Sequence, residues 1–190
     1  VFSGVGKTRA EMAMALEAGV RCFNVESAAE LAVLSEVALG LNRTAAVSLR
    51  VNPDVDAGTH PYISTGLKGN KFGIAHERAV SVYQRAARLK GLHVVGIDCH
   101  IGSQLTEIPP FVAALQKILG LVDQLSARGI EISHIDIGGG LGIRYRDEPP
   151  PPVAAYIGAL RECLGTRPQK VLFEPGRSLV GNTGVLLTRV

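Results

Sequence analysis

The chain has few aromatic residues, no tryptophan and no large excess of either charge. Aromatic residues make up 5% of its 190 residues, and 20 basic side chains stand against 17 acidic ones. The net charge of +3 is spread along the sequence, which argues against a nucleic-acid-binding surface. No apolar run approaches the roughly 18 residues of a membrane-spanning helix. We therefore expect neither nucleic acid nor a membrane as a partner.

Cysteine is also scarce. Its three copies, Cys22, Cys99 and Cys163, show neither metal-binding nor disulfide spacing. An odd number of cysteines in apolar surroundings is typical of reduced thiols, which predicts a cytoplasmic protein. Cys99 and His100 are adjacent like a pair of metal ligands, but neighbours on a strand point to opposite faces of its sheet. We expect no metal site.

Apolar residues are abundant, at 46%, and they fall into alternating strand and helix patterns. Stretches rich in β-branched residues predict strands near residues 1–4, 20–26, 45–51, 94–100, 132–137 and 170–174. Helices are expected after capping boxes at 8–11 and 27–30, and over 77–89, 115–125 and 156–164. This alternation is typical of parallel βαβ units, whose strands are buried on both faces.

The predicted fold class is therefore α/β. The units fit either an open doubly wound sheet or most of a (β/α)8 TIM barrel. The barrel is favoured because chemically suggestive residues follow several different strands instead of gathering at one switch point. Complete barrels run to about 250 residues, so we expect residues 1–190 to be one partial barrel domain from a longer protein. The long polar connection over 52–73 is expected to be functional, with a disordered insertion as the alternative.

A glycine-rich run, residues 138–142, follows the strand expected at 132–137. Glycines there let the backbone approach an anion with its N–H groups exposed. A dinucleotide-binding fingerprint would need a glycine at Ile143, so a phosphate site is the better interpretation, and a plain tight turn stays open. Ser103 and Gly176, which follow two other strands, could contribute a hydroxyl and an N–H group to the same phosphate.

Three side chains at strand ends could act on a ring or a carboxylate. Glu174 could pair with a protonated ring nitrogen, and Arg177 could hold a substrate carboxylate in a bidentate fork. The alternative is an ion pair between these two residues at the barrel rim. His100 could be a general base or a flat ring stacked on a cofactor, and a hydrogen-bonded core histidine is the alternative.

Taken together, these segments resemble the fold-type III pyridoxal-phosphate decarboxylases. The similarity runs in order through residues 2–8, 24–27, 50–53, 60–66, 71–74, 100–104, 136–141 and 174–177. Segments 60–66 and 100–104 favour the branch that acts on diaminopimelate over the ornithine and arginine branches. The resemblance implies an alanine-racemase-like barrel, of which this chain covers roughly the third to eighth strands.

The resemblance also implies a pyridoxal phosphate cofactor and a role for each candidate residue. His100 would stack on the pyridine ring, Glu174 would pair with its nitrogen, and Arg177 would bind a carboxylate of a small amino-acid substrate. The implied phosphate contacts are Ser103, Gly139, Gly140 and Gly176. The reaction would convert meso-2,6-diaminopimelate to L-lysine and carbon dioxide, the cofactor taking up electrons and the protein orienting it.

The chain departs from the family's pattern in one respect. No segment matches the family's early strand with the lysine that forms the Schiff base, so we expect no catalytic lysine here. The family's C-terminal β-domain, which completes the site across a homodimer interface, is not matched either. The fragment alone should be inactive. Ornithine, arginine or carboxynorspermidine decarboxylation, a non-catalytic pyridoxal-phosphate carrier, and a barrel enzyme acting on a phosphorylated sugar stay open as alternatives.

Overall fold

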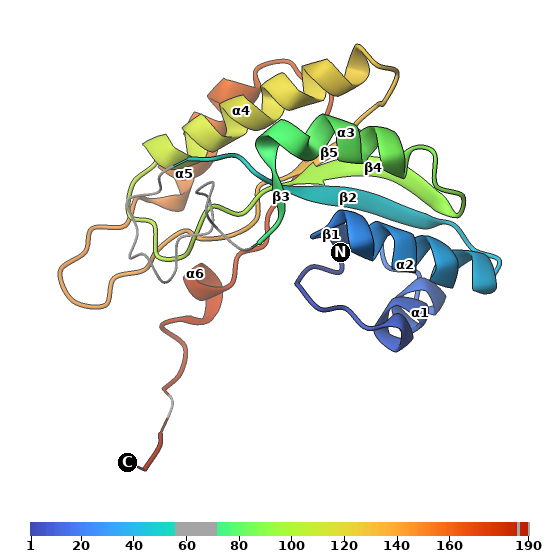
Figure 1. Cartoon of the computed structure of the whole chain (residues 1–190). Helices are drawn as coiled ribbons and strands as arrows, with labels where there is room; N and C mark the ends of the chain where they lie inside the picture. The colour runs from blue at the N-terminus through green and yellow to red at the C-terminus, as the bar shows by residue number, and fades with distance from the viewer. Residues whose placement is uncertain (56–71, 186, 190) are drawn as a thin grey trace.

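The computed structural model describes residues 1–55, 72–185 and 187–189. Its helices and strands alternate as predicted (Figure 1). The helices are α1 (Arg9–Glu17), α2 (Ala28–Gly40), α3 (His76–Ala86), α4 (Pro109–Ser126), α5 (Val153–Leu164) and α6 (Arg177–Val180). The strands are β1 (Phe23–Val25), β2 (Ala45–Asn52), β3 (Ile74–Ala75), β4 (Leu92–Asp98), β5 (His134–Asp136) and β6 (Lys170–Leu172).

The strands form a parallel sheet in the order β1-β2-β4-β5-β6, and β3 pairs with β2 beside this path. The predicted first strand is reduced to a single parallel bridge between Phe2 and Phe23, which extends the sheet beyond β1. The predicted strands over 20–26, 132–137 and 170–174 are shorter than expected, at three residues each. The α/β class and the parallel sheet are confirmed.

The sheet is strongly curved. This is seen from side chains of strands that are not neighbours in the sheet, which meet across one of its faces. The Cys22 sulfur lies 3.7 Å from Nε2 of His134. Two residues further along each strand, the amide nitrogen of Asn24 lies 3.2 Å from a carboxylate oxygen of Asp136. Strands β1 and β5 are separated by β2 and β4 in the sheet. This curvature agrees with the predicted partial barrel.

Alternation along the strands separates an apolar outer face from a polar inner face. Leu49, Ile97 and Ile135 are completely buried within the apolar core that the helices cover. The helices follow one another around the strands, with α1 packed on α2, and α4 packed between α3 and α5 (Figure 1). The inner face carries buried polar side chains instead, namely Asn24, Ser48, Asp98, His134 and Asp136. A polar barrel interior is thus built into the strands.

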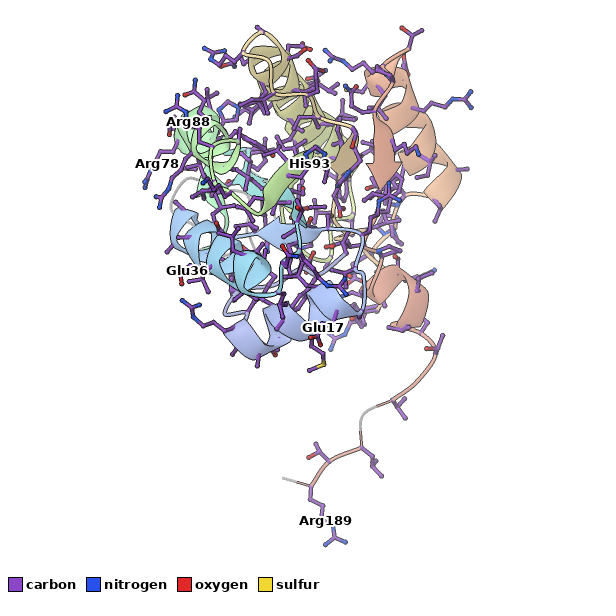
Figure 2. The ribbon with its side chains drawn as sticks, turned by 90° about the vertical axis from the view of Figure 1, so that its right-hand side faces the viewer. Glu17, Glu36, Arg78, Arg88, His93 and Arg189 are labelled. Carbon is purple, nitrogen blue, oxygen red and sulfur yellow. The ribbon has the colours of Figure 1, made fainter. Side chains whose placement is uncertain are left out.

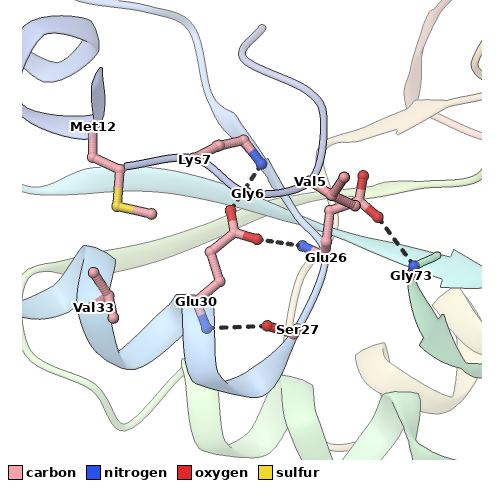
Figure 3. Close-up of a pocket in the computed structure, with 9 residues that line it drawn as sticks. All are labelled: Val5, Gly6, Lys7, Met12, Glu26, Ser27, Glu30, Val33 and Gly73. Atoms are coloured by element: carbon pink, nitrogen blue, oxygen red, sulfur yellow. Dashed lines mark hydrogen bonds and ion pairs between the residues drawn. The ribbon is translucent and has the colours of Figure 1, made fainter. Parts of the chain in front are cut away.

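The two predicted capping boxes differ in outcome. At α1 the box is complete, since Thr8 accepts a hydrogen bond from the Glu11 N–H group and the Glu11 carboxylate accepts one from the Thr8 N–H group. At α2 only half of it forms, with Ser27 accepting from the Glu30 N–H group at 3.1 Å. The Glu30 carboxylate turns instead to the ammonium group of Lys7 (Figure 3).

Charged side chains cover the outside of the helices. Figure 2 shows Glu17, Glu36, Arg78 and Arg88 projecting from α1, α2, the start of α3 and the turn that follows α3. In the part of the chain that the structure describes, no helix combines the length and apolarity needed to cross a membrane. Most of the connection over 52–73, which we expected to be functional, lies outside the described residues.

Candidate cofactor site at the strand ends

Loops that follow the strands enclose a cavity of about 350 Å³ at the carboxyl ends of the sheet. Two of the predicted site residues, His100 and Glu174, line it together, although they follow different strands. The full lining is Ser3, Gly4, Arg50, Phe72, Asp98, His100 and Glu174. The carboxyl ends of parallel strands are where ligands bind in such folds. This cavity is therefore the candidate site.

His100 lies against the glycine-rich turn. Its Nδ1 accepts a hydrogen bond from the Gly139 N–H group at 3.3 Å. Burial, aided by the nearby Arg50 cation, lowers the pKa of the His100 imidazole to about 4. The ring is therefore neutral at pH 7, and a general base works best with a pKa near the working pH. Of the two functional roles that the sequence left open, this geometry favours the flat stacked ring.

The glycine-rich turn is held by its neighbours on both sides. Asp136 accepts a hydrogen bond from the Gly138 N–H group at 2.9 Å. A Cβ on Gly139 would collide with the carbonyl oxygen of Glu174, and one on Gly140 would collide with that of Gly102. These glycines thus permit close packing of three strand-end loops, a role that the sequence analysis did not assign.

Glu174 is anchored by hydrogen-bond donors from the opposite edge of the sheet. The Ser3 hydroxyl donates to its carboxylate, and the amide of Asn24 lies 3.3 Å from the same oxygen. Its backbone N–H group donates to the Gly138 carbonyl at 2.8 Å. Neither Ser3 nor Asn24 was a predicted site residue. Their contacts join segments about 150 residues or more apart, which local patterns do not reveal.

Arg177 contacts Gln104, and not Glu174 as in the ion pair that the sequence analysis gave as an alternative. Its guanidinium lies 3.3 Å from the side-chain oxygen of Gln104 and 5.8 Å from the ring centre of Tyr145. Among the described residues, Glu174 and Arg177 form no ion pair with each other, so that alternative is not supported. A guanidinium has five N–H donors, which leaves others for a carboxylate.

Ser103 and Gly176, the remaining predicted phosphate contacts, flank the same turn from two sides. Ser103 follows Gly102, whose carbonyl faces Gly140. Gly176 directly precedes α6 and lies two residues after Glu174. Contact of both residues with a phosphate stays a prediction.

Two buried carboxyl groups lie beneath the site. Burial raises the pKa of Asp98 well above its ordinary value, and the neighbouring Asp136 and Glu174 charges add to this effect. Burial likewise raises the pKa of Asp136. One Asp98 oxygen, Oδ1, has no hydrogen-bond partner in the described part of the chain. Since buried polar groups are normally paired, this oxygen marks an unsatisfied position in the cavity wall.

Arg50 is the cation among these acids, and sequence reasoning missed it. It forms an ion pair of 2.7 Å with Glu26, whose other oxygen accepts a hydrogen bond from the Gly73 N–H group at 3.0 Å. Its guanidinium also lies 5.6 Å from the ring centre of Phe72. The signal was available, because Arg50 shares its inward strand parity with the buried Ser48. Figure 3 shows Glu26 reaching Gly73.

Lys7 lies beside the site and is held by structural contacts. Its ammonium group is almost fully buried and donates to the carbonyl oxygens of Gly4 and Asn24 at 2.6 and 2.8 Å. It also pairs with Glu30 at 2.8 Å (Figure 3). Three oxygens therefore hold it in a structural position.

Cys99 is buried in the apolar core while His100 lines the cavity, so the two point apart as predicted.

The comparisons with known proteins agree with one another. Residues 1–181 match the family described as pyridoxal-dependent decarboxylase, pyridoxal binding domain. Diaminopimelate decarboxylase of Pseudomonas aeruginosa is 65% identical over 190 residues, all of this chain and 46% of that protein. The enzyme of Neisseria meningitidis serogroup A is 59% identical over the same length, 47% of its own. The chain thus spans about half the length of the curated relatives it matches.

A solved structure shows the same architecture. Diaminopimelate decarboxylase from Helicobacter pylori, complexed with L-lysine, superposes with a TM-score of 0.90 at 39% identity. The match covers 94% of this chain and 45% of the other.

Proposed function

Because the chain belongs to the pyridoxal-dependent decarboxylases, as their pyridoxal binding domain, we propose that it forms the cofactor-binding part of a diaminopimelate decarboxylase. The reaction is the conversion of meso-2,6-diaminopimelate to L-lysine and carbon dioxide. The observation that carries the proposal is the 65% identity to such an enzyme along the entire chain. The site residues fall within that match, and their arrangement suits the cofactor.

The cavity suits the ring of pyridoxal phosphate in size and chemistry, and the glycine turn that contacts His100 adjoins it. Its volume of about 350 Å³ lies within the usual range for small-molecule sites. The neutral His100 offers a flat face to a pyridine ring, and Glu174 offers a carboxylate to a ring nitrogen. The glycine turn and its neighbours offer backbone N–H groups and a hydroxyl to a phosphate. The residues that would hold the phosphate are Ser103, Gly139, Gly140 and Gly176.

When bound, pyridoxal phosphate takes up the negative charge that the departing carbon dioxide leaves on the substrate. The chain's own residues serve this chemistry by placement. Glu174 would offer a carboxylate acceptor to a protonated ring nitrogen, which would keep the ring electron-poor. His100 would offer its ring face to the pyridine ring, and its own orientation is set by the Gly139 N–H group. Arg177 would bind a substrate carboxylate with its planar fork of N–H donors.

The lysine that attaches the cofactor is assigned to a part of the protein outside this chain. Lys7 is committed to structural contacts, and the relatives are about twice as long as this chain. We also assign residues 1–190 to one partial barrel domain, and the whole enzyme to a cytoplasmic homodimer whose partner subunit completes the site.

The test is a substrate panel with the full-length protein loaded with pyridoxal phosphate. Release of carbon dioxide is measured with meso-diaminopimelate, L-ornithine, L-arginine and carboxynorspermidine at matched concentrations. The proposal predicts the largest kcat/KM for meso-diaminopimelate and stoichiometric L-lysine. A larger value for another substrate would move the protein to another branch of the family. A visible cofactor band without any carbon dioxide would point to a non-catalytic carrier.

A further inference from the structure

Asn24 occupies a central position on the inner face of the curved sheet. It lies on β1 and is completely buried. Its amide nitrogen is 2.8 Å from the Ser3 hydroxyl oxygen, 3.2 Å from Oδ2 of Asp136 and 3.3 Å from Oε1 of Glu174. Three segments that are distant in sequence therefore converge on one side-chain amide.

These contacts join the two halves of the candidate cofactor site. The Ser3 hydroxyl, which accepts from Asn24, donates in turn to the Glu174 carboxylate. Asp136, the other acceptor, fixes the glycine turn by accepting from the Gly138 N–H group at 2.9 Å. One side of the network thus ends at the carboxylate assigned to the ring nitrogen. The other side ends at the turn assigned to the phosphate.

We propose that Asn24 and Ser3 are positioning residues of the cofactor site, which hold Glu174 at the ring nitrogen and set its placement relative to the glycine turn. The inference rests on the proposed function, because it assigns Glu174 and the turn their roles toward pyridoxal phosphate. It adds two residues from the opposite edge of the sheet, and neither of them was assigned a contact with the cofactor above.

The physical need for these donors follows from the crowding of carboxyl groups. Asp98, Asp136 and Glu174 influence one another electrostatically inside the sheet. A buried carboxylate is costly unless donors or a cation accompany it. Asn24 supplies N–H donors to two of these groups without adding a charge of its own. An aspartate in its place would remove the donors and add repulsion, and a leucine would leave both carboxylates without this partner.

A purely structural role for Asn24 would give different results. If it only held the edges of the sheet together, its replacement would lower the melting temperature and leave the environment of the ring nitrogen unchanged. If it acts through Glu174, the ring nitrogen itself reports the change. The natural probe is pyridoxal phosphate labelled with 15N at the ring nitrogen, because the 15N chemical shift responds to protonation and hydrogen bonding at that atom.

The experiment uses the full-length protein and its variants Ser3→Ala, Ser3→Thr, Asn24→Leu, Glu174→Gln and Asn24→Leu/Glu174→Gln. Three quantities are measured: the dissociation constant of pyridoxal phosphate, the 15N shift of the bound cofactor, and the melting temperature of the apoprotein. Ser126→Ala is the matched control, since Ser126 donates to the carboxylate of Glu131 at 2.9 Å on the exposed surface.

We expect Ser3→Ala and Asn24→Leu to weaken cofactor binding about tenfold, the usual effect of losing one hydrogen bond to a charged group. Both should move the 15N shift toward that of Glu174→Gln. Ser3→Thr keeps the hydroxyl and should recover most of the affinity, and Ser126→Ala should change neither quantity. In the double variant the changes of the 15N shift should not add, because Asn24 acts on the ring nitrogen through Glu174.

Two results would overturn the inference separately from the proposed function. An unchanged 15N shift and affinity in Ser3→Ala, in a protein that decarboxylates diaminopimelate, would leave the function standing and remove the positioning role. Additive changes of the 15N shift in Asn24→Leu/Glu174→Gln would do the same for Asn24. If Asn24→Leu does not fold, the Ser3 pair decides. A wild-type protein that binds no pyridoxal phosphate would overturn the proposed function and this inference with it.

Discussion

The backbone of Gly139 packs so closely against the carbonyl oxygen of Glu174 that no Cβ fits between them. We predict that Gly139→Ala separates the two loops and costs about 1–3 kcal/mol of unfolding free energy, the range for overpacked sites. Pyridoxal phosphate binding should weaken with it. Thermal melts and cofactor titrations of the full-length protein measure both effects.

Gly158→Ala is the control for that substitution. Gly158 lies within α5, and a Cβ there would meet nothing within 4 Å. Alanine should stabilise the helix by up to about 1 kcal/mol. A Gly139→Ala variant as stable as Gly158→Ala would contradict the close packing of the two loops.

The second prediction concerns His100 and pH. Its folded-state pKa of about 4 lies below the ordinary value of 6.5, so the unfolded chain binds more protons between these values. The unfolding free energy should therefore fall as the pH drops from about 6.5 towards 4, by on the order of 2 kcal/mol. His100→Phe removes this contribution. Denaturant melts of the two proteins at several pH values test it, and parallel pH curves would contradict it.

Asp98 should contribute to the pH dependence of the unfolding free energy with the opposite sign to His100. Burial raises the pKa of this carboxyl, so the folded protein holds a proton that the unfolded chain releases above its ordinary pKa of 3.8. The contribution of Asp98 to stability therefore falls as the pH rises above that value. Asp98→Asn should therefore raise the unfolding free energy more at pH 8 than at pH 5. The exposed Asp147→Asn serves as control, and an equal shift at both pH values would count against a buried, unpaired Asp98.

For Arg177 the prediction concerns substrate binding. Lysine keeps the charge but lacks the planar fork that grips a carboxylate with two hydrogen bonds. Arg177→Lys should lower kcat/KM for meso-diaminopimelate about tenfold or more, mostly through KM. Arg128→Lys, which alters an exposed contact with the Gln124 carbonyl, should have no effect. Steady-state kinetics with unchanged KM in Arg177→Lys would exclude the proposed carboxylate contact.

The sequence predicted the fold class and most elements because their signals are local. Alternating apolar patterns and helix caps depend on neighbouring residues, so strands such as β2 and helices such as α4 were found. The short elements β3 and α6 were missed, since two and four residues carry too little periodicity. The half-formed cap at α2 was missed for another reason: Lys7, a distant residue, takes the Glu30 carboxylate.

The candidate site divides in the same way. His100 and Glu174 were proposed because they follow apolar strands, and the structure places both at one cavity. Asn24 and Ser3 were not, because their partners lie across a curved sheet whose curvature no local pattern specifies. The glycine turn was identified, but the packing demand on Gly139 follows only from its contact with another loop.

The most direct test of this account is a crystal structure of the full-length protein with pyridoxal phosphate bound. The account predicts the pyridine ring against His100, its nitrogen within hydrogen-bond distance of Glu174, and the phosphate at the turn formed by Gly139 and Gly140 with Ser103 and Gly176 beside it. A cofactor bound elsewhere, or with its phosphate pointing away from the glycine turn, would contradict it.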